Sequence, residues 1–337
     1  MSKPSERIRQ TKEVRLKKLA LTLIPLFLLA GCAAPQDANL TGYALVSQGL
    51  SATCDGFETG SAIEQVKVTG EFGTEPTVEF PTPLSGNGVE TKVISDGKGG
   101  AIVGSQRVAL HFTGFNAGTG EQFQGSEFGS EDYIIQDLIS GATPDFCKAL
   151  TGVNVGSRIA VLLNAPNAHE GNGIETLGIG ADDGVLFIFD VLEAYLPKAN
   201  GEAKPALAGM PTVILAPSGQ PGIQIPTSNA PLEFSKNALI EGRGDTIAIG
   251  DTVIVHYSGW TWLGEQFDSS WENGAPASFQ VNSESLIQGF VQALEGAKVG
   301  SQVIAVIPPE LGYGSNAQGS IPANSTLIFV IDILGKE

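Results

Sequence analysis

The stretch Thr252 to Tyr257 reads TVIVHY, and its β-branched residues are typical of a strand. Two further runs of this kind lie downstream, from Ser301 to Ile307 and from Thr326 to Leu334. In the run that ends at Ile307, every residue after Gln302 is apolar, so we expect both faces of that strand to be buried. The three runs predict a sheet as the main structure of this part of the chain.

One helix is predicted between the first and the second of these runs. Its apolar residues recur at the i, i+3, i+4 spacing of one helix face and are Leu286, Ile287, Phe290, Val291 and Leu294. We expect Ser283 or Ser285 to cap the start of the helix and Gly296 to follow its end. Strands with a single helix predict an α+β fold in which the helix packs across an antiparallel sheet.

The same pattern occurs a second time, earlier in the chain. The segment 120–123 (GEQF) recurs as 264–267, and the segment 186–192 (LFIFDVL) resembles 328–334 (IFVIDIL). Two copies are too few for a solenoid, so the repeat predicts a tandem of globular domains. We expect the first domain at 62–197 and the second at 210–337, joined by a linker at 198–209.

Composition excludes several classes of function. The chain has 337 residues, a formal net charge of −17 and 43 glycines. The negative charge argues against a nucleic-acid partner, which needs a basic face to neutralise phosphates. Three cysteines and three histidines are too few for a zinc site of the usual spacing, and nothing in the sequence predicts a metal or a cofactor.

The N-terminus is typical of an export signal. A basic segment precedes an apolar run from Leu19 to Ala30, which is too short to span a bilayer because a spanning helix needs about 20 residues. The run ends in Leu29-Ala30-Gly31-Cys32, which resembles the bacterial lipoprotein box. That resemblance implies a signal peptide over 1–31, a lipid on Cys32 and an extracytoplasmic position on the bacterial cell membrane. The alternative is an ordinary signal peptide with Cys32 there by chance.

The remaining cysteines are Cys54 and Cys147. Residues 32–61 are rich in small and polar residues and are predicted to form a tether. Outside the cytoplasm, Cys54 and Cys147 could pair and join the tether to the first domain. Two unpaired thiols are the alternative, because the distance between them is not visible in the sequence.

In the second domain, five motifs occur in a characteristic order. They are 255–259 (VHYSG), 267–270 (FDSS), 286–290 (LIQGF), 308–314 (PPELGYG) and 321–323 (IPA) leading to Phe329. Over about 90 residues this order resembles the FKBP-type peptidyl-prolyl isomerases. The resemblance implies a half-barrel of antiparallel strands around a short helix in each domain, with a shallow pocket between helix and sheet. It also implies isomerisation of Xaa–Pro bonds in exported polypeptides, and macrolide inhibitors as ligands.

Carried over position by position, the resemblance assigns the pocket residues. Catalytic roles fall to Tyr257, Asp268, the Ile287 backbone N–H and the Tyr313 hydroxyl, and substrate-binding roles to Phe267, Leu286, Phe290, Ile321 and Phe329. By contrast, we expect His256 to be a structural residue of its strand. Trp271, Ala277 and Ser320 depart from the family pattern, so substrate preference and inhibitor binding stay open.

The first domain resembles a degenerate copy. Phe112 replaces the pocket tyrosine, Gln124 replaces the aspartate and His169 falls near the position of Tyr313. The apolar positions Phe123, Phe146 and Phe187 persist. We expect this domain to keep the fold with little activity, as a spacer or a client-binding surface. For the whole chain, a non-catalytic chaperone or assembly factor that binds apolar segments is the alternative function, and a solute-binding lipoprotein finds no support in the repeat.

Overall fold

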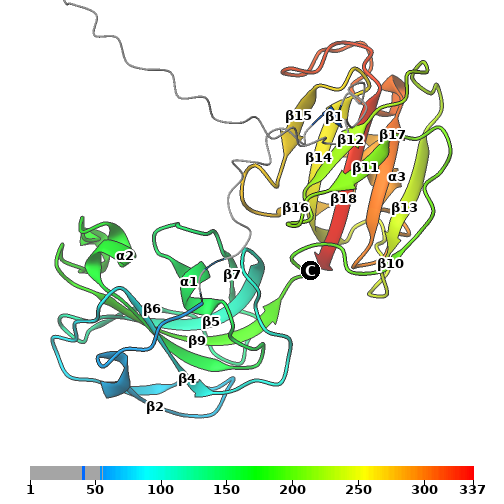
Figure 1. Cartoon of the computed structure of the whole chain (residues 1–337). Helices are drawn as coiled ribbons and strands as arrows, with labels where there is room; N and C mark the ends of the chain where they lie inside the picture. The colour runs from blue at the N-terminus through cyan, green and yellow to red at the C-terminus, as the bar shows by residue number, and fades with distance from the viewer. Residues whose placement is uncertain (1–39, 42–53, 55) are drawn as a thin grey trace, which may run out of the picture. The chain divides into compact units, whose positions relative to one another are not determined.

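The computed structural model describes residues 40–41, 54 and 56–337 (Figure 1). The predicted signal peptide at 1–31 and the predicted lipidation site Cys32 lie outside the described residues. Within the described part of the chain, no helix is long and apolar enough to cross a membrane.

The first large sheet contains six strands in the order β4-β8-β9-β5-β6, with β7 also paired to β5. All its pairs are antiparallel. The strands are β4 (Val89–Ser95), β5 (Arg107–Asn116), β6 (Gln122–Gly125), β7 (Ile134–Asp137), β8 (Arg158–Leu163) and β9 (Val185–Ala194). Helix α1 (Phe146–Leu150) packs on one face, and α2 (Ala165–His169) follows β8.

The second large sheet contains seven strands in the order β10-β13-β17-β18-β14-β15, with β16 paired to β14. Its strands are β10 (Glu202–Ala203), β13 (Ser235–Glu241), β14 (Thr252–Thr261), β15 (Gln266–Ser269), β16 (Ala277–Gln280), β17 (Gln302–Ile307) and β18 (Leu327–Lys336). Helix α3 (Gln288–Leu294) packs against this sheet. The three predicted strands are confirmed as β14, β17 and β18, and all six residues of β17 are buried, as its apolar pattern predicts.

The two sheets repeat each other down to their irregularities. In the pairing of β5 with β9 the register shifts between Ala109 and Leu110, and in that of β14 with β18 it shifts between Ile254 and Val255. A second shift follows Gly114 in the first sheet and Gly259 in the second. Because bulges turn a strand and change its twist, the shared shifts bend both sheets at equivalent positions.

Both faces of each sheet are covered. One face packs around the helix, and the other buries a smaller apolar cluster. In the first copy that cluster includes Ile63 of the 3-10 turn η2 (Ile63–Gln65), beside the hairpin of β2 (Lys67–Thr69) and β3 (Thr77–Glu79). In the second copy it is built on Trp260 and Ile223, the latter from the hairpin of β11 (Thr212–Leu215) and β12 (Pro221–Gln224). Strand β1 (Leu40–Thr41) pairs with β12.

The start of the predicted helix is wrong. Helix α3 begins at Gln288, and Ile287 is its N-cap with an extended ψ of 144° and no side-chain cap. The Asn282 side chain accepts the N–H groups of Glu284 and Ser285 at 3.0 Å. This local turn uses the polar residues expected to cap the helix, and it leaves Leu286 and Ile287 ahead of the helix.

Two predicted boundaries also differ from the structure. The segment expected to be tether is attached from Cys54 onward: Cys54 is disulfide-bonded to Cys147, Phe57 packs on the core, and Glu58 bridges to Glu90. In the expected linker, the Ala199 N–H donates to Asp332 at 2.8 Å and β10 pairs with β13. The described part of each segment is therefore attached to a neighbouring sheet or helix, although its composition is typical of a flexible chain.

Candidate functional site

A cavity of about 560 Å³ opens between the sheet of the second copy and the segment that leads into α3. Its lining contains all nine residues that the sequence assigned to the pocket: Tyr257, Phe267, Asp268, Leu286, Ile287, Phe290, Tyr313, Ile321 and Phe329. These residues come from β14, β15, α3, β18, the segment just before α3 and the loop after β17. The fold therefore brings together residues that are up to 72 positions apart in the chain.

Aromatic rings form the base of the cavity. Phe290 and Phe329 are buried, and their ring centroids lie 5.0 Å apart with an interplanar angle of 85°. Phe267 meets Phe329 edge to face at 5.5 Å, and Tyr257 meets Phe290 in the same way at 6.1 Å. Edge-to-face packing of this kind fixes ring orientation, so the base is a rigid apolar surface.

Gly259 makes this packing possible. A Cβ at this position would lie 2.6 Å from the Phe267 ring and 2.9 Å from the Phe329 ring. Since these distances are shorter than any real contact, only a residue without a side chain lets both rings reach the sheet. Gly114 is surrounded in the same way by Phe123 and Phe187 in the first copy.

The polar groups of the cavity meet at Asp268. The Tyr257 hydroxyl donates a hydrogen bond to Asp268 Oδ2. Burial, and then the bond to Asp268, raise the pKa of Tyr257. Burial, and then the nearby Asp268, raise the pKa of Tyr313 as well. Both phenols therefore stay protonated at neutral pH and can act as hydrogen-bond donors.

Two donors that line the cavity have no partner among the described residues. Neither the Ile287 backbone N–H nor the Tyr313 hydroxyl has a hydrogen-bond partner among residues 56–337. The extended conformation at Ile287 places its N–H ahead of the first turn of α3. A substrate carbonyl would accept a hydrogen bond from such groups, because a donor left without an acceptor in an apolar cavity costs free energy.

His256 lies outside the cavity lining. Its Nδ1 lies 2.9 Å from Ser270 Oγ, and Ser270 Oγ accepts the Tyr257 N–H at 2.9 Å. The imidazole stacks on Trp271 with centroids 4.0 Å apart. Burial lowers the pKa of His256 to about 3, so the ring stays neutral and holds the chain beside Tyr257 in place.

Sequence reasoning missed six lining residues: Phe279, Glu284, Ser285, Gln318, Gly319 and Ser320. Phe279 packs edge to face on Phe290 at 5.7 Å. It lies two residues after Ala277 in β16 and thus on the same face, which was the available signal. Phe279 lines the cavity, whereas Ala277 does not.

The first copy lacks the polar groups. Phe112 and Gln124 occupy the positions of Tyr257 and Asp268 in equivalent strand registers. His169, which the sequence places near the position of Tyr313, is the last residue of α2. His169 is buried, with Nε2 2.8 Å from the Asp183 carbonyl and Nδ1 2.9 Å from the Gly173 nitrogen. Both ring nitrogens are used internally, so His169 presents no free donor.

Comparison with known proteins places the similarity on the second copy. The sequence profile of FKBP-type peptidyl-prolyl cis-trans isomerases matches residues 244–334. A probable FKBP-type peptidyl-prolyl cis-trans isomerase of Haemophilus influenzae is 49% identical over 94 residues, which cover 28% of this chain and 38% of that protein. An FK506-binding protein of Streptomyces anulatus is 36% identical over 118 residues, which cover 34% of this chain and 95% of that protein.

Among solved structures, the three FKBP domains of a wheat protein align with 74% of this chain and 95% of that chain, at 17% identity and a TM-score of 0.34. The match to the Haemophilus protein thus spans well under half of that protein, whereas the match to the Streptomyces protein spans nearly all of it. Residues 244–334, which the family profile matches, contain every residue of the cavity lining.

Proposed function

Because this chain belongs to the family of FKBP-type peptidyl-prolyl cis-trans isomerases, we propose that its second copy isomerises Xaa–Pro bonds in exported polypeptides. The observation that carries the proposal is one aromatic cavity lined by the hydrogen-bonded Tyr257–Asp268 pair, by Tyr313 and by Ile287. The alternative, a chaperone that binds apolar segments without catalysis, would need the aromatic base but not the Tyr257–Asp268 pair.

The chemistry fits such a cavity. Rotation about a peptide bond breaks amide resonance and meets a barrier of about 18–20 kcal/mol. Water stabilises the planar amide more than the twisted one, because the planar form is more polar. An apolar base that excludes water therefore favours the twisted form, and fixed donors at Ile287 and Tyr313 would hold the carbonyl while the bond turns. No step needs a covalent intermediate.

The test is an isomerisation assay on the chain from residue 33 onward. We expect it to accelerate cis-trans exchange in a short Xaa–Pro peptide, and we expect Tyr257→Phe with Asp268→Asn to lose most of that acceleration. An exchange rate equal to that of the peptide alone would reject the enzyme in favour of the non-catalytic chaperone. Addition of FK506 would show whether the cavity also takes a macrolide.

We propose further that the chain is exported and held on the bacterial cell membrane by lipid on Cys32. The lipoprotein-like motif before Cys32 and the Cys54–Cys147 disulfide support this, because disulfides persist outside the reducing cytoplasm. Mass spectrometry of the protein from membranes should find an acylated Cys32 as the first residue. A Cys32→Ser chain should then be found in the soluble fraction.

The first copy serves, in this proposal, as a spacer or client-binding surface with little activity of its own. It keeps the aromatic residues but has no counterpart of the Tyr257–Asp268 pair. If the double variant Tyr257→Phe, Asp268→Asn kept the full rate of the unaltered chain, the first copy would have to supply it.

A further inference from the structure

The charged side chains that line the cavity are both acidic. Asp268 accepts a hydrogen bond from the Tyr257 hydroxyl. Glu284 lies two residues before Leu286, in the segment that leads into α3, and also lines the cavity. Glu284 is exposed, and its backbone N–H is fixed by Asn282. Within the described residues its carboxylate has no ion-pair or hydrogen-bond partner. The cavity therefore carries a free carboxylate at its rim.

Among the described residues, no Lys or Arg lines the cavity. The chain contains no Lys or Arg from Gly244 to Ala297 and none from Val299 to Gly335. These two segments supply every residue of the cavity lining. Each nearby lysine is engaged elsewhere: Lys236 donates to the carbonyls of Gln292 and Glu295, Lys336 pairs with Asp251, and Lys298 lies 3.9 Å from Glu241.

The position of the Glu284 carboxylate decides which side chains of a bound peptide it can contact. The aromatic base is the part of the cavity that suits a proline ring, so the side chains on either side of that proline would lie toward the rim. A carboxylate there attracts a cationic side chain and repels an anionic one, and an exposed contact of this kind has a small effect on binding. Because the charge is exposed, salt should screen it.

We propose that this cavity selects Xaa–Pro bonds flanked by Lys or Arg over those flanked by Asp or Glu, with Glu284 as the specificity-determining residue. The inference rests on the proposed isomerase function and names its substrate class. It concerns the choice among substrates, whereas the acceleration itself depends on the aromatic base and the donors around Asp268.

The experiment uses three peptides that differ only in Xaa, which is Lys, Gln or Glu. Exchange measured by NMR avoids a coupled protease with its own charge preference. With the chain from residue 33 onward, we expect kcat/KM for the Lys peptide to exceed that for the Glu peptide by roughly twofold to tenfold in dilute buffer. In about 1 M salt, where the screening length falls to about 3 Å, the ratio should approach one.

Two variants with the same change in net charge locate the effect. Glu284→Gln should bring the Lys-to-Glu ratio close to one. Glu265→Gln removes an exposed acid of the β14–β15 turn that does not line the cavity, and it should leave the ratio as it is. Equal rates for the three peptides, or a ratio that Glu284→Gln does not change, would overturn the selectivity while leaving the isomerase intact. If no peptide were accelerated, the proposed function itself would fail, and the selectivity with it.

Discussion

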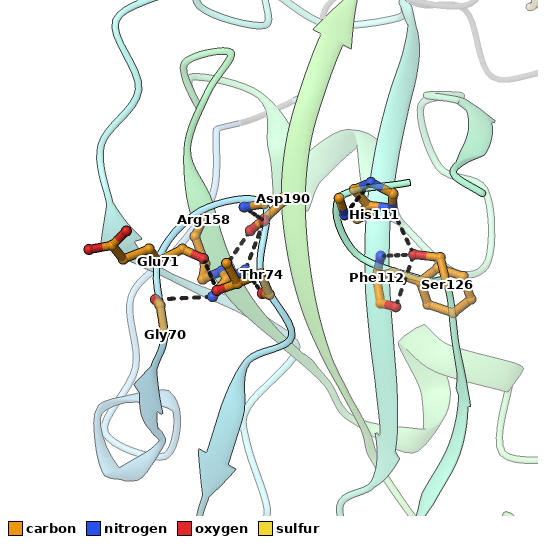
Figure 2. A network of polar contacts seen from close by, with 10 residues as sticks. Gly70, Glu71, Thr74, His111, Phe112, Ser126, Arg158 and Asp190 are labelled. Atoms are coloured by element: carbon orange, nitrogen blue, oxygen red, sulfur yellow. Dashed lines mark hydrogen bonds and ion pairs between the residues drawn. The ribbon is translucent and has the colours of Figure 1, made fainter. Parts of the chain in front are cut away.

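Arg158 and Asp190 form a bidentate ion pair in which both side chains are fully buried (Figure 2). The remaining guanidinium N–H groups donate to the carbonyls of Gly70 and Thr74, and Asp190 also accepts the Gly73 N–H at 2.7 Å. The pair thus ties the loop between β2 and β3 to the large sheet of the first copy. In Figure 2 the neighbouring network joins His111, Ser126 and Phe112, the counterpart of His256, Ser270 and Tyr257.

We predict that Arg158→Met destabilises the first copy by about 3–5 kcal/mol, because it leaves the Asp190 charge buried without a partner. The double variant Arg158→Met, Asp190→Leu should recover most of this loss. Urea unfolding followed by far-ultraviolet circular dichroism gives the free energies. Tryptophan fluorescence is the internal control, since Trp260, Trp262 and Trp271 all lie in the second copy and their transition should not move.

At the equivalent position, the second copy has a glutamine in place of the arginine. Gln302 and Asp332 are a register pair like Arg158 and Asp190, and Asp332 accepts from Gln302 Nε2 at 2.7 Å and from the Ala199 N–H at 2.8 Å. With an amide in place of a guanidinium, burial dominates and raises the pKa of Asp332 to about 6. The segment ahead of β10 is therefore held by a carboxylate that titrates in a mildly acidic range.

This shift predicts a pH dependence for Asp332. The unfolded carboxyl titrates near 3.8 and the folded one near 6, so the folded state binds the proton more tightly. Its stabilising contribution is complete below about pH 4 and is lost as pH rises through 6, on the order of 3 kcal/mol in all. Asp332→Asn should remove this contribution, so that the stability of the variant, unlike that of the unaltered chain, falls as pH falls toward 4 because of His256. Urea unfolding followed by tryptophan fluorescence between pH 4 and 7 tests it, and parallel curves for both proteins would contradict it.

His256 should act in the opposite direction. Its pKa falls from 6.5 to about 3 on folding, so its contribution is complete above about pH 6.5 and is lost as pH falls toward 3, by about 1.4 kcal/mol per pH unit. Between pH 4 and 6 the two slopes nearly cancel in the unaltered chain. His256→Gln should therefore reveal a second copy that gains stability on acidification in this window, read by the same fluorescence measurement.

At the cavity, we predict that Asp268→Ala and Phe290→Ala separate catalysis from stability. Asp268 is exposed, and within the described residues its carboxylate is hydrogen-bonded only to Tyr257. Its removal should therefore lower kcat/KM for an Xaa–Pro peptide with little change in the free energy of unfolding. Phe290 is 3% exposed and packs on Tyr257, Phe279 and Phe329, so its removal should cost about 3–5 kcal/mol. Equal loss of stability in both variants would argue against this division.

The Cys54–Cys147 disulfide closes a long segment, with a sequence separation of 93. Replacing both cysteines by serine should destabilise the first copy by about 2–4 kcal/mol, because a long loop is freed in the unfolded chain. Circular dichroism should show the loss, and the tryptophan transition of the second copy should stay in place. A matched treatment of the unaltered chain with a reductant should reproduce the effect.

The sequence was most informative where the signal is local or repeated. The β-branched runs predict the strands that contain Tyr257, Ile307 and Phe329. The order of the motifs predicts nine of the residues that line the cavity. The helix start was missed because Leu286 and Ile287 have helical spacing, while the turn at Asn282 decides that they are extended.

Other features depend on partners far away in the chain. Nothing near Arg158 in the sequence indicates that it meets Asp190, 32 residues on, with its remaining donors on Gly70 and Thr74. The small and polar residues before residue 62 likewise predict a tether. The sequence does not reveal that this segment is attached, because the attachment depends on Cys147 and on the core that Phe57 contacts. No local pattern in the sequence marks Glu284 as a residue of the cavity lining.

The disulfide has a mechanical consequence. A pull applied to the chain ahead of Cys54 crosses the covalent bond directly to Cys147, at the second residue of α1. The load then leaves along the chain after Cys147, and the segment between the two cysteines carries no tension. Strands β4 to β7 lie in that segment. They are therefore outside the covalent path of a force applied ahead of Cys54, and such a force does not pull them from the sheet through the chain.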